Sequence, residues 1–411
     1  MMKLILPVGM LLLSVGMLLA GNGLQSTLLP MRAQIEEFAA FDIGLMGSAY
    51  YLGFVAGCLA APGLVRRVGH IRTFAALVSL ASALTLAHAL FIHPVFWWLL
   101  RILAGASFAG LYLVIESWLN ERADNKSRGL IMSAYQIVVL TGITIGQLLI
   151  IAFPPAELGV FLLTSLVISL AAIPVALSIS PAPDPPGNAK LRLTKLYRTS
   201  PAGIMACIAV GITQGAFWTL GPTFALDIGM SSSGAAIFMS IAVISGALFQ
   251  YPFGKLSDSM DRRKVLIGLC AGTSVFSVLL MFWPTPSQLA LFALVFGFGA
   301  FAMSVYAVAV SYVFDFAAPD ARVETSSGIL LLNAAGSVVG PMVAAAFDEY
   351  FPQKGLFLLT TITYACLIGF ILYRSTQRAA AKTRDNTPHF ADTPGPVAPL
   401  RRWWGLKSVR K

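Results

Sequence analysis

The feature that most limits what this chain can fold into is a succession of long apolar runs separated by short polar stretches. A helix needs roughly 20 predominantly apolar residues to cross a bilayer. We predict twelve such segments, at about 5–29, 43–65, 73–92, 95–118, 129–153, 158–179, 200–224, 232–254, 265–283, 287–314, 325–347 and 355–373. Because backbone groups in lipid must be paired within their own segment, these runs predict an all-α membrane protein.

Composition agrees with lipid as the solvent. Charged residues make up only 11% of the 411 residues and hydrophobic residues 57%, whereas soluble domains are roughly 25% charged. The net charge of +10 does not indicate nucleic acid, because the Lys and Arg residues sit in short loops and in the tail. The four cysteines lie inside apolar runs without paired spacing, so we expect no disulfide framework, metal site or cofactor.

The basic residues also predict the orientation. If the N-terminus is inside, 25 of the 28 Lys and Arg residues lie on the cytoplasmic side, and only Arg32 and Lys354 lie outside. Cytoplasmic loops carry such an excess of positive charge, so both termini are expected in the cytoplasm of a bacterial inner-membrane protein. The first apolar run resembles a secretory signal peptide, but eleven similar runs follow, so we interpret it as the first spanning helix.

The longest polar interior stretch divides the chain into two parts. Residues 181–199 begin with several prolines and a glycine, which cannot continue a helix. We therefore predict an N-terminal six-helix bundle over 1–180, a cytoplasmic linker over 181–199 and a C-terminal six-helix bundle over 200–375. A basic cytoplasmic tail follows over 376–411, and its Trp403–Trp404 pair either docks on the membrane surface or hangs free.

The two predicted bundles repeat each other at a spacing near 192 residues. Pro30 at the predicted end of helix 1 corresponds to Pro222 in helix 7, and Gly105 corresponds to Gly297. With a shift of two residues, the pair Gly142 and Gly146 corresponds to Gly336 and Gly340. Each bundle begins on the inside, so the repeat predicts two pseudo-symmetric bundles of the same orientation, with glycines that allow close helix contacts.

The loop between helices 8 and 9 carries the most specific motif, the run from Gly254 through Asp258 to Arg262 and Arg263. It resembles the loop signature of the major facilitator superfamily (MFS). This resemblance extends over the whole chain and implies the MFS fold of twelve transmembrane helices. The charges either form a latch, in which the two arginines pair with Asp258 or a facing acid, or merely follow the positive-inside rule.

The first-half copy of this loop has lost its acid. Arg66 stands at that position, with Arg67 and Arg72 nearby. This departure, together with the segment around Glu116 in helix 4, is similar to the bacterial YcaD-like branch of the superfamily. Glu116 either pairs with the three arginines and replaces the missing acid, or carries protons. We favour the pairing.

Arg101 is the strongest candidate for contact with a transported solute. A cation inside a membrane helix is costly unless it faces a cavity or a partner; its alternative is to reach the outer interface along its aliphatic stem. The remaining candidates for a substrate path are polar or aromatic residues inside helices, each with interhelical hydrogen bonding as its alternative role: Asn22, Gln25, Tyr112, Gln136, Gln147, Gln214, Trp218, Tyr306 and Asn333.

These features indicate a monomeric secondary transporter that moves a small organic solute by alternating access, with proton coupling left open. Because the deepest charge is a cation, a neutral or anionic solute is favoured. The alternatives are multidrug efflux and, in a different class, a membrane sensor on a transporter-like scaffold. An enzyme would need clustered His, Asp or Glu at membrane depth, and only Glu116 is available, so no enzymatic activity is expected.

Overall fold

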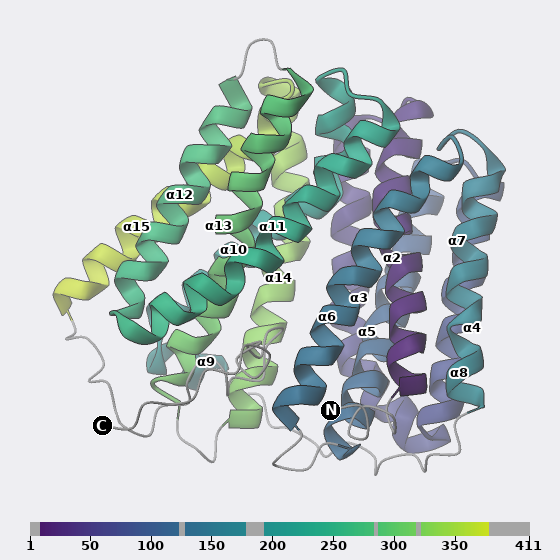
Figure 1. Cartoon of the computed structure of the whole chain (residues 1–411), viewed down its shortest axis with the longest axis horizontal. Helices are drawn as coiled ribbons and strands as arrows, with labels where there is room; N and C mark the ends of the chain where they lie inside the picture. The colour runs from purple at the N-terminus through teal and green to yellow at the C-terminus, as the bar shows by residue number, and fades with distance from the viewer. Residues whose placement is uncertain (1–8, 123–127, 178–192, 283–286, 318–321, 378–411) are drawn as a thin grey trace.

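The computed structural model (Figure 1) describes residues 9–122, 128–177, 193–282, 287–317 and 322–377. Within these ranges twelve helical spans are long and apolar enough to cross a membrane. The helices are α2 (Gly9–Ile35), α3 (Ala40–Val68), α4 (His70–Leu90), α5 (Pro94–Arg122), α6 (Arg128–Leu149, continued by η2, Ile150–Ala152), α7 (Leu158–Leu170, continued by α8, Ala172–Ala176), α9 (Leu193–Thr199), α10 (Pro201–Asp227), α11 (Ser232–Ser259), α12 (Arg262–Phe282), α13 (Gln288–Phe314), α14 (Arg322–Tyr350) and α15 (Gly355–Gln377).

The prediction of twelve spans is confirmed, but several helices run further than predicted. Pro30 and Pro222 were expected to end helices 1 and 7, yet each lies inside its helix, five residues before the end. Likewise Gly254 does not end helix 8, because α11 continues through it to Ser259. Neighbouring helices in a bundle can satisfy the backbone groups that proline frees, so a proline near the end of a span need not stop it.

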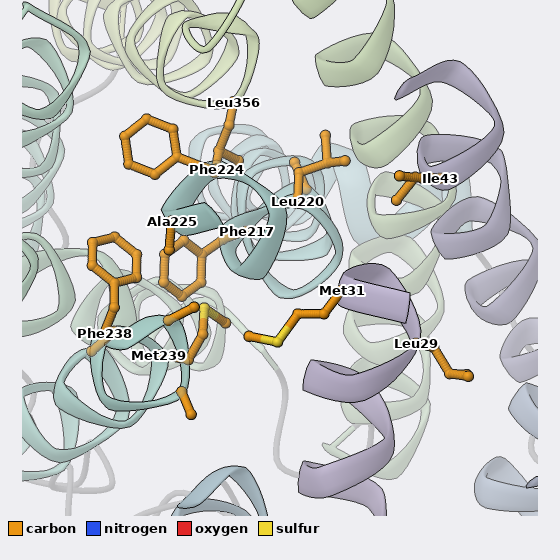
Figure 2. Packing of buried hydrophobic residues seen from close by; sticks show 14 of the residues in the cluster. Leu29, Met31, Ile43, Phe217, Leu220, Phe224, Ala225, Phe238, Met239 and Leu356 are labelled. Carbon is orange, nitrogen blue, oxygen red and sulfur yellow. The ribbon is translucent and has the colours of Figure 1, made fainter. Parts of the chain in front are cut away.

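The two halves lie side by side in Figure 1, with α2–α8 on one side and α10–α15 on the other. They are joined most clearly at the end where α2 and α10 finish, which we call the joined end. One apolar cluster there combines Leu29, Met31 and Ile43 with Phe217 and Leu220. Figure 2 shows Met31 of α2 pointing toward Met239 of α11. The joined end is therefore sealed by side chains from both halves.

At the opposite end, where α2 and α10 begin, the clusters of buried residues in the described part of the chain do not cross between the halves. One cluster contains only residues between Leu11 and Val175. The other contains only residues between Leu196 and Ile371. We call this the divided end. The predicted basic loops around Arg66 and Arg262 belong to this end, because α3 and α11 finish there.

Glycines set the closest helix contacts inside each half. A methyl group added at Gly146 of α6 would come 2.0 Å from the carbonyl oxygen of Ala20 on α2. In the second half, a methyl group at Gly340 of α14 would meet the carbonyl oxygen of Ile212 on α10, also at 2.0 Å. These two seams, α2 with α6 and α10 with α14, confirm the predicted packing role of both glycines.

A second pair of seams corrects the predicted register of the repeat. A methyl group at Gly105 of α5 would meet the carbonyl oxygen of Tyr50 on α3. The residue with the same role in α13 is Gly299, which approaches the carbonyl oxygen of Ala242 on α11. The predicted counterpart, Gly297, faces the ring of Phe276 instead. The shift of two residues seen for helices 5 and 11 therefore applies to helices 4 and 10 as well.

The predicted linker over 181–199 falls outside the described residues except for its last part, where α9 spans Leu193–Thr199. The tail over 376–411 falls outside them beyond Gln377. The domain boundaries therefore stay predictions.

Candidate functional site

Arg101 lies in the first third of α5 and is buried, with 9% of the residue exposed. Its guanidinium carbon sits 4.2 Å from the centre of the Tyr50 ring on α3. This cation–π contact is possible because Gly105, one turn further along α5, lets the two helices approach closely. The Nε atom of Arg101 is buried without a hydrogen-bond partner. Tyr50 thus offsets part of the cost of the buried cation and leaves donor capacity for a further group.

Two other predicted path residues, Asn22 and Tyr112, interact with the tyrosine that contacts Arg101. The side-chain amide of Asn22 on α2 interacts with the hydroxyls of Tyr50 and Tyr112. Arg101 also interacts electrostatically with Tyr51. Three helices, α2, α3 and α5, therefore hold one cluster, the Arg101 cluster, made of Arg101, Tyr50, Asn22 and Tyr112. The sequence reasoning missed Tyr50, although two adjacent tyrosines in an otherwise apolar run were a signal.

Glu116 continues the polar surface of α5 toward the divided end. Its carboxylate accepts a hydrogen bond from the hydroxyl of Tyr135 on α6. The side chain is exposed, and it interacts electrostatically with Tyr306 on α13. α13 belongs to the other half, so this interaction crosses between the halves. The predicted pairing of Glu116 with Arg66, Arg67 and Arg72 stays a prediction.

The second half presents neutral polar groups at the corresponding depth. The Asn333 amide on α14 donates to the carbonyl oxygen of Cys207 at 3.0 Å. The Gln214 amide on α10 donates to the sulfur of Met303 at 3.7 Å. Trp218 packs edge-on against Phe217, with ring centres 6.1 Å apart. These residues and Tyr306 are partly exposed, whereas Gln136 of the first half is buried.

Like Asn333 and Gln214, two more predicted path residues make interhelical hydrogen bonds, the contact typical of their alternative role. Gln25 is fully buried, and its amide donates to Thr85 on α4 at 2.9 Å. Gln147 on α6 is also fully buried, and its carbonyl oxygen accepts from Ser240 on α11 at 3.3 Å. The first contact lies within one half, while the second links the halves at the joined end. Both hydrogen bonds are of the interhelical kind.

The motif residues of the second half form a buried ion-pair network at the divided end. Arg262 contacts Asp258 at 3.0 Å and Asp315 at 3.1 Å. The pairing expected between Asp258 and Arg262 is therefore present, and Asp315, just after α13, is the facing acid that the sequence did not single out. Burial raises the pKa of Asp315 to about 6, although Arg262 opposes this rise. The network ties the loop between α11 and α12 to the end of α13.

Arg263 makes a different set of contacts. Its Nε donates to the Tyr312 hydroxyl at 2.9 Å, and its backbone N–H donates to the Asp261 carboxylate at 3.0 Å. Asp261 is therefore the acid at the start of α12, where the helix dipole favours an anion. Gly254 is buried inside α11.

The first-half copy of this loop is built differently. Arg66, Arg67 and Arg72 are all exposed, whereas Arg262 and Arg263 are buried. Between Arg67 and Arg72, Gly69 adopts a φ of 85°, a backbone conformation that favours glycine. His70 follows, buried near Trp118 with ring centres 6.3 Å apart.

Two overlapping stretches of the chain, residues 11–247 and 203–411, match the family profile of the Major Facilitator Superfamily. The chain belongs to this superfamily. The MFS fold expected from the sequence is thereby confirmed. The family consists of membrane transporters, so this MFS chain is a multi-pass membrane transporter and not an enzyme.

The relatives include two MFS transporters described as uncharacterized. The chain is 26% identical over 387 residues to the MFS-type transporter YcaD of Escherichia fergusonii, covering 93% of this chain and 98% of that one. It is 26% identical over 357 residues to the MFS-type transporter Ent638_1421 of Enterobacter sp., covering 86% and 92%. The expected similarity to the YcaD-like branch is confirmed.

Solved structures show the same MFS fold at lower identity. A mutant form of the nucleoside transporter NupG aligns with a TM-score of 0.75 at 16% identity, covering 90% of this chain and 99% of that one. A bacterial homologue of the human lysosomal transporter Spinster, in an inward-facing and unoccupied conformation, aligns with a TM-score of 0.67 at 14% identity, covering 89% and 94%. A variant of the Escherichia coli fucose:proton symporter FucP aligns with a TM-score of 0.56 at 16% identity, covering 90% and 99%.

Proposed function

We propose that this protein is a secondary active transporter that moves a small organic solute, neutral or anionic, across the bacterial inner membrane by alternating access. The observation that carries the proposal is the Arg101 cluster. It places a buried cation, an amide and two tyrosine hydroxyls together inside a membrane helix bundle. Polar groups at membrane depth are costly to maintain, which favours a functional role for them.

The chemistry of the cluster favours an anion or a polar neutral group. Arg101 supplies a positive charge, and the ion pairs that form among the described residues do not include it. Asn22 and the tyrosines add hydrogen-bond donors. Across the space between the halves, Gln214, Tyr306 and Asn333 offer neutral groups. A solute with one anionic or strongly polar end and an uncharged remainder would match both sides.

The packing between the halves supports alternating access. Side chains from both halves seal the joined end, while the buried clusters at the divided end stay within one half. Under the positive-inside orientation the divided end faces the cytoplasm, so this arrangement corresponds to a state open to the inside. The latch proposed for Asp258, Arg262 and Arg263 would act at that end when it closes.

We include proton coupling in the proposal because of Glu116. This carboxylate is exposed between the halves and is hydrogen-bonded by Tyr135. Substrate uptake into proteoliposomes should then respond to an imposed pH gradient, and Glu116→Gln should abolish that response while retaining exchange of solute. Uptake by wild-type protein that ignores the pH gradient would remove coupling from the proposal.

The solute site is tested with a thermal-shift screen of small organic anions and polar neutral compounds, followed by uptake of the hits into proteoliposomes. Arg101→Gln should reduce apparent affinity for a hit by at least about tenfold, as expected when one partner of a desolvated charge contact is removed. Lys255→Gln, which removes an exposed cation from α11, is the matched control. If the Arg101→Gln variant takes up the solute as the wild-type protein does and has an unchanged melting temperature, the site assignment is contradicted.

A further inference from the structure

We propose that a phosphate group binds in a pocket at the divided end of the second half, separate from the Arg101 cluster. The pocket has an empty volume of about 300 Å³, including the part open to solvent. It lies where α10 begins, between the start of α12 and the ends of α13 and α15. The residues that carry the proposal are Ser200, Ala202, Arg263, Tyr312, Phe316 and Arg374.

Ser200 provides the first sign that the pocket is built for a ligand. It precedes α10 and is 2% exposed, yet its hydroxyl has no hydrogen-bond partner. Its side chain does not cap the helix. A buried hydroxyl without a partner costs free energy, and a bound acceptor oxygen would remove that cost. The hydroxyl lines the pocket and can supply one such donor.

The first turn of α10 adds backbone donors. The first N–H groups of a helix have no carbonyl partner within that helix, and the helix dipole makes this end positive. Pro201 has no N–H, so the available groups begin at Ala202 and Gly203. A methyl group on Gly203 would come 2.9 Å from the Ser200 Oγ and 2.6 Å from Val313. Glycine here therefore keeps space free beside the hydroxyl, and helix N-termini of this kind bind phosphate.

Two arginines complete the positive lining. Tyr312 fixes Arg263, because its hydroxyl accepts from the Arg263 Nε and its ring lies 5.9 Å from the guanidinium carbon. Arg374 reaches the pocket from the last turn of α15. Asp258 and Asp315 are paired with Arg262, and the Asp261 carboxylate accepts from the backbone N–H of Arg263, not from its guanidinium. Guanidinium groups bind phosphate oxygens through charge-assisted hydrogen bonds, so a phosphate suits this donor set.

The surroundings bear on where the phosphate comes from. Phe316 and Ile371 give the pocket an apolar side. The preceding helix α9 exposes Leu193 and Tyr197, at the end that the positive-inside rule places in the anionic cytoplasmic leaflet. A phospholipid headgroup can therefore enter with its acyl chains directed toward the bilayer, while a soluble phosphate ester would enter from the cytoplasm. Both sources share the same phosphate chemistry.

The experiment measures phosphatidylglycerol binding to the full-length purified protein by native mass spectrometry, with inorganic phosphate as the soluble competitor. Arg374→Gln and Ser200→Ala should each weaken lipid binding about three- to tenfold, and Arg374→Lys should recover part of the loss. Lys264→Gln removes an equal charge from an exposed position beside Arg263 and should leave binding unchanged. Melting temperatures of the lipid-free variants verify that each one is folded.

The outcomes separate the sources and can overturn the proposal. If the pocket variants bind lipid more weakly and millimolar phosphate does not displace lipid from the wild-type protein, the headgroup is the ligand. If phosphate displaces lipid from the wild-type protein but not from Arg374→Gln, the ligand is a soluble phosphate. Equal losses of lipid binding in Lys264→Gln and Arg374→Gln would mean that the lipid is attracted to the basic surface alone. Unchanged lipid binding in both Arg374→Gln and Ser200→Ala would show that the pocket is not a phosphate site.

Discussion

The two halves of the molecule share a backbone plan but place their charges differently. In the first half, the charges of interest lie within the membrane, at Arg101 and Glu116, while its loop arginines are exposed. In the second half, the path residues are neutral, and the buried charges lie in the loop network of Arg262 with Asp258 and Asp315. Duplication thus preserved the packing of the helices while the two copies came to hold different chemistry.

This difference shows that the two halves must keep the same close glycine contacts but can differ in their polar residues. At Gly146 and at Gly340 an added methyl group would meet the facing carbonyl oxygen at the same distance, 2.0 Å, so a side chain at either seam would force the helices apart. The polar residues have no such geometric constraint. We therefore expect equal effects from matched changes in the seams and unequal effects from matched changes in the charged loops.

The largest effect is expected at the seams. Gly146→Ala and Gly340→Ala each put a methyl group 2.0 Å from a carbonyl oxygen, and overpacking of this kind costs about 1–3 kcal/mol or more. Both variants should lower the apparent melting temperature of the detergent-purified protein by similar amounts. Gly268→Ala is the control, because nothing lies within 4 Å of its added methyl group. A large loss in only one seam variant would contradict the equivalence of the seams.

The charged loops should break the symmetry. Arg262→Gln removes the cation that Asp258 and Asp315 share, and removing one partner of a buried pair costs about 3 kcal/mol. The first-half change Arg67→Gln affects an exposed side chain and should cost less than about 1 kcal/mol. Thermal unfolding of both variants measures the difference. Equal destabilisation would show that the first-half loop also depends on a buried charge network.

A smaller effect should follow from pH. The folded-state pKa of Asp315 is raised to about 6, above the value of an unfolded carboxyl, so the native state binds this proton first. The charged carboxyl therefore costs stability above that pH, and the cost decreases as the pH falls below about 6 and is gone near the pKa of an unfolded carboxyl, about 4. Relative to Asp315→Asn, wild-type protein should gain about 1–2 °C in melting temperature between about pH 7.5 and 5. A constant difference between the two proteins would rule out this titration.

Much of the fold was predictable because lipid imposes a length and a composition on every span. The twelve segments, their order and the glycine contacts followed from these constraints. The helix ends were less predictable, because Pro30 and Gly254 act as terminators only where no neighbouring helix supports the backbone. The repeat register at Gly105 was off by two residues, since sequence spacing cannot show which glycine faces a carbonyl oxygen.

The candidate site was only partly predictable. Arg101, Asn22 and Tyr112 stand out as polar residues in apolar segments, and the structure brings them together. Their partner Tyr50 did not stand out, because a tyrosine is common in membrane helices and its contact with Arg101 depends on how closely α3 and α5 pack. Asp315 was missed for a similar reason, since its pairing with Arg262 crosses between two helices that are distant in sequence.

The seam between α2 and α6 has a consequence for how the protein is made. α2 leaves the ribosome before α3, α4 and α5, so its glycine-lined face has no permanent partner until α6 arrives. The same delay separates α10 from α14. During each interval the exposed face must be shielded by lipid, by the insertion machinery or by temporary neighbours. Neither seam can therefore close before the fifth spanning helix of its half enters the membrane.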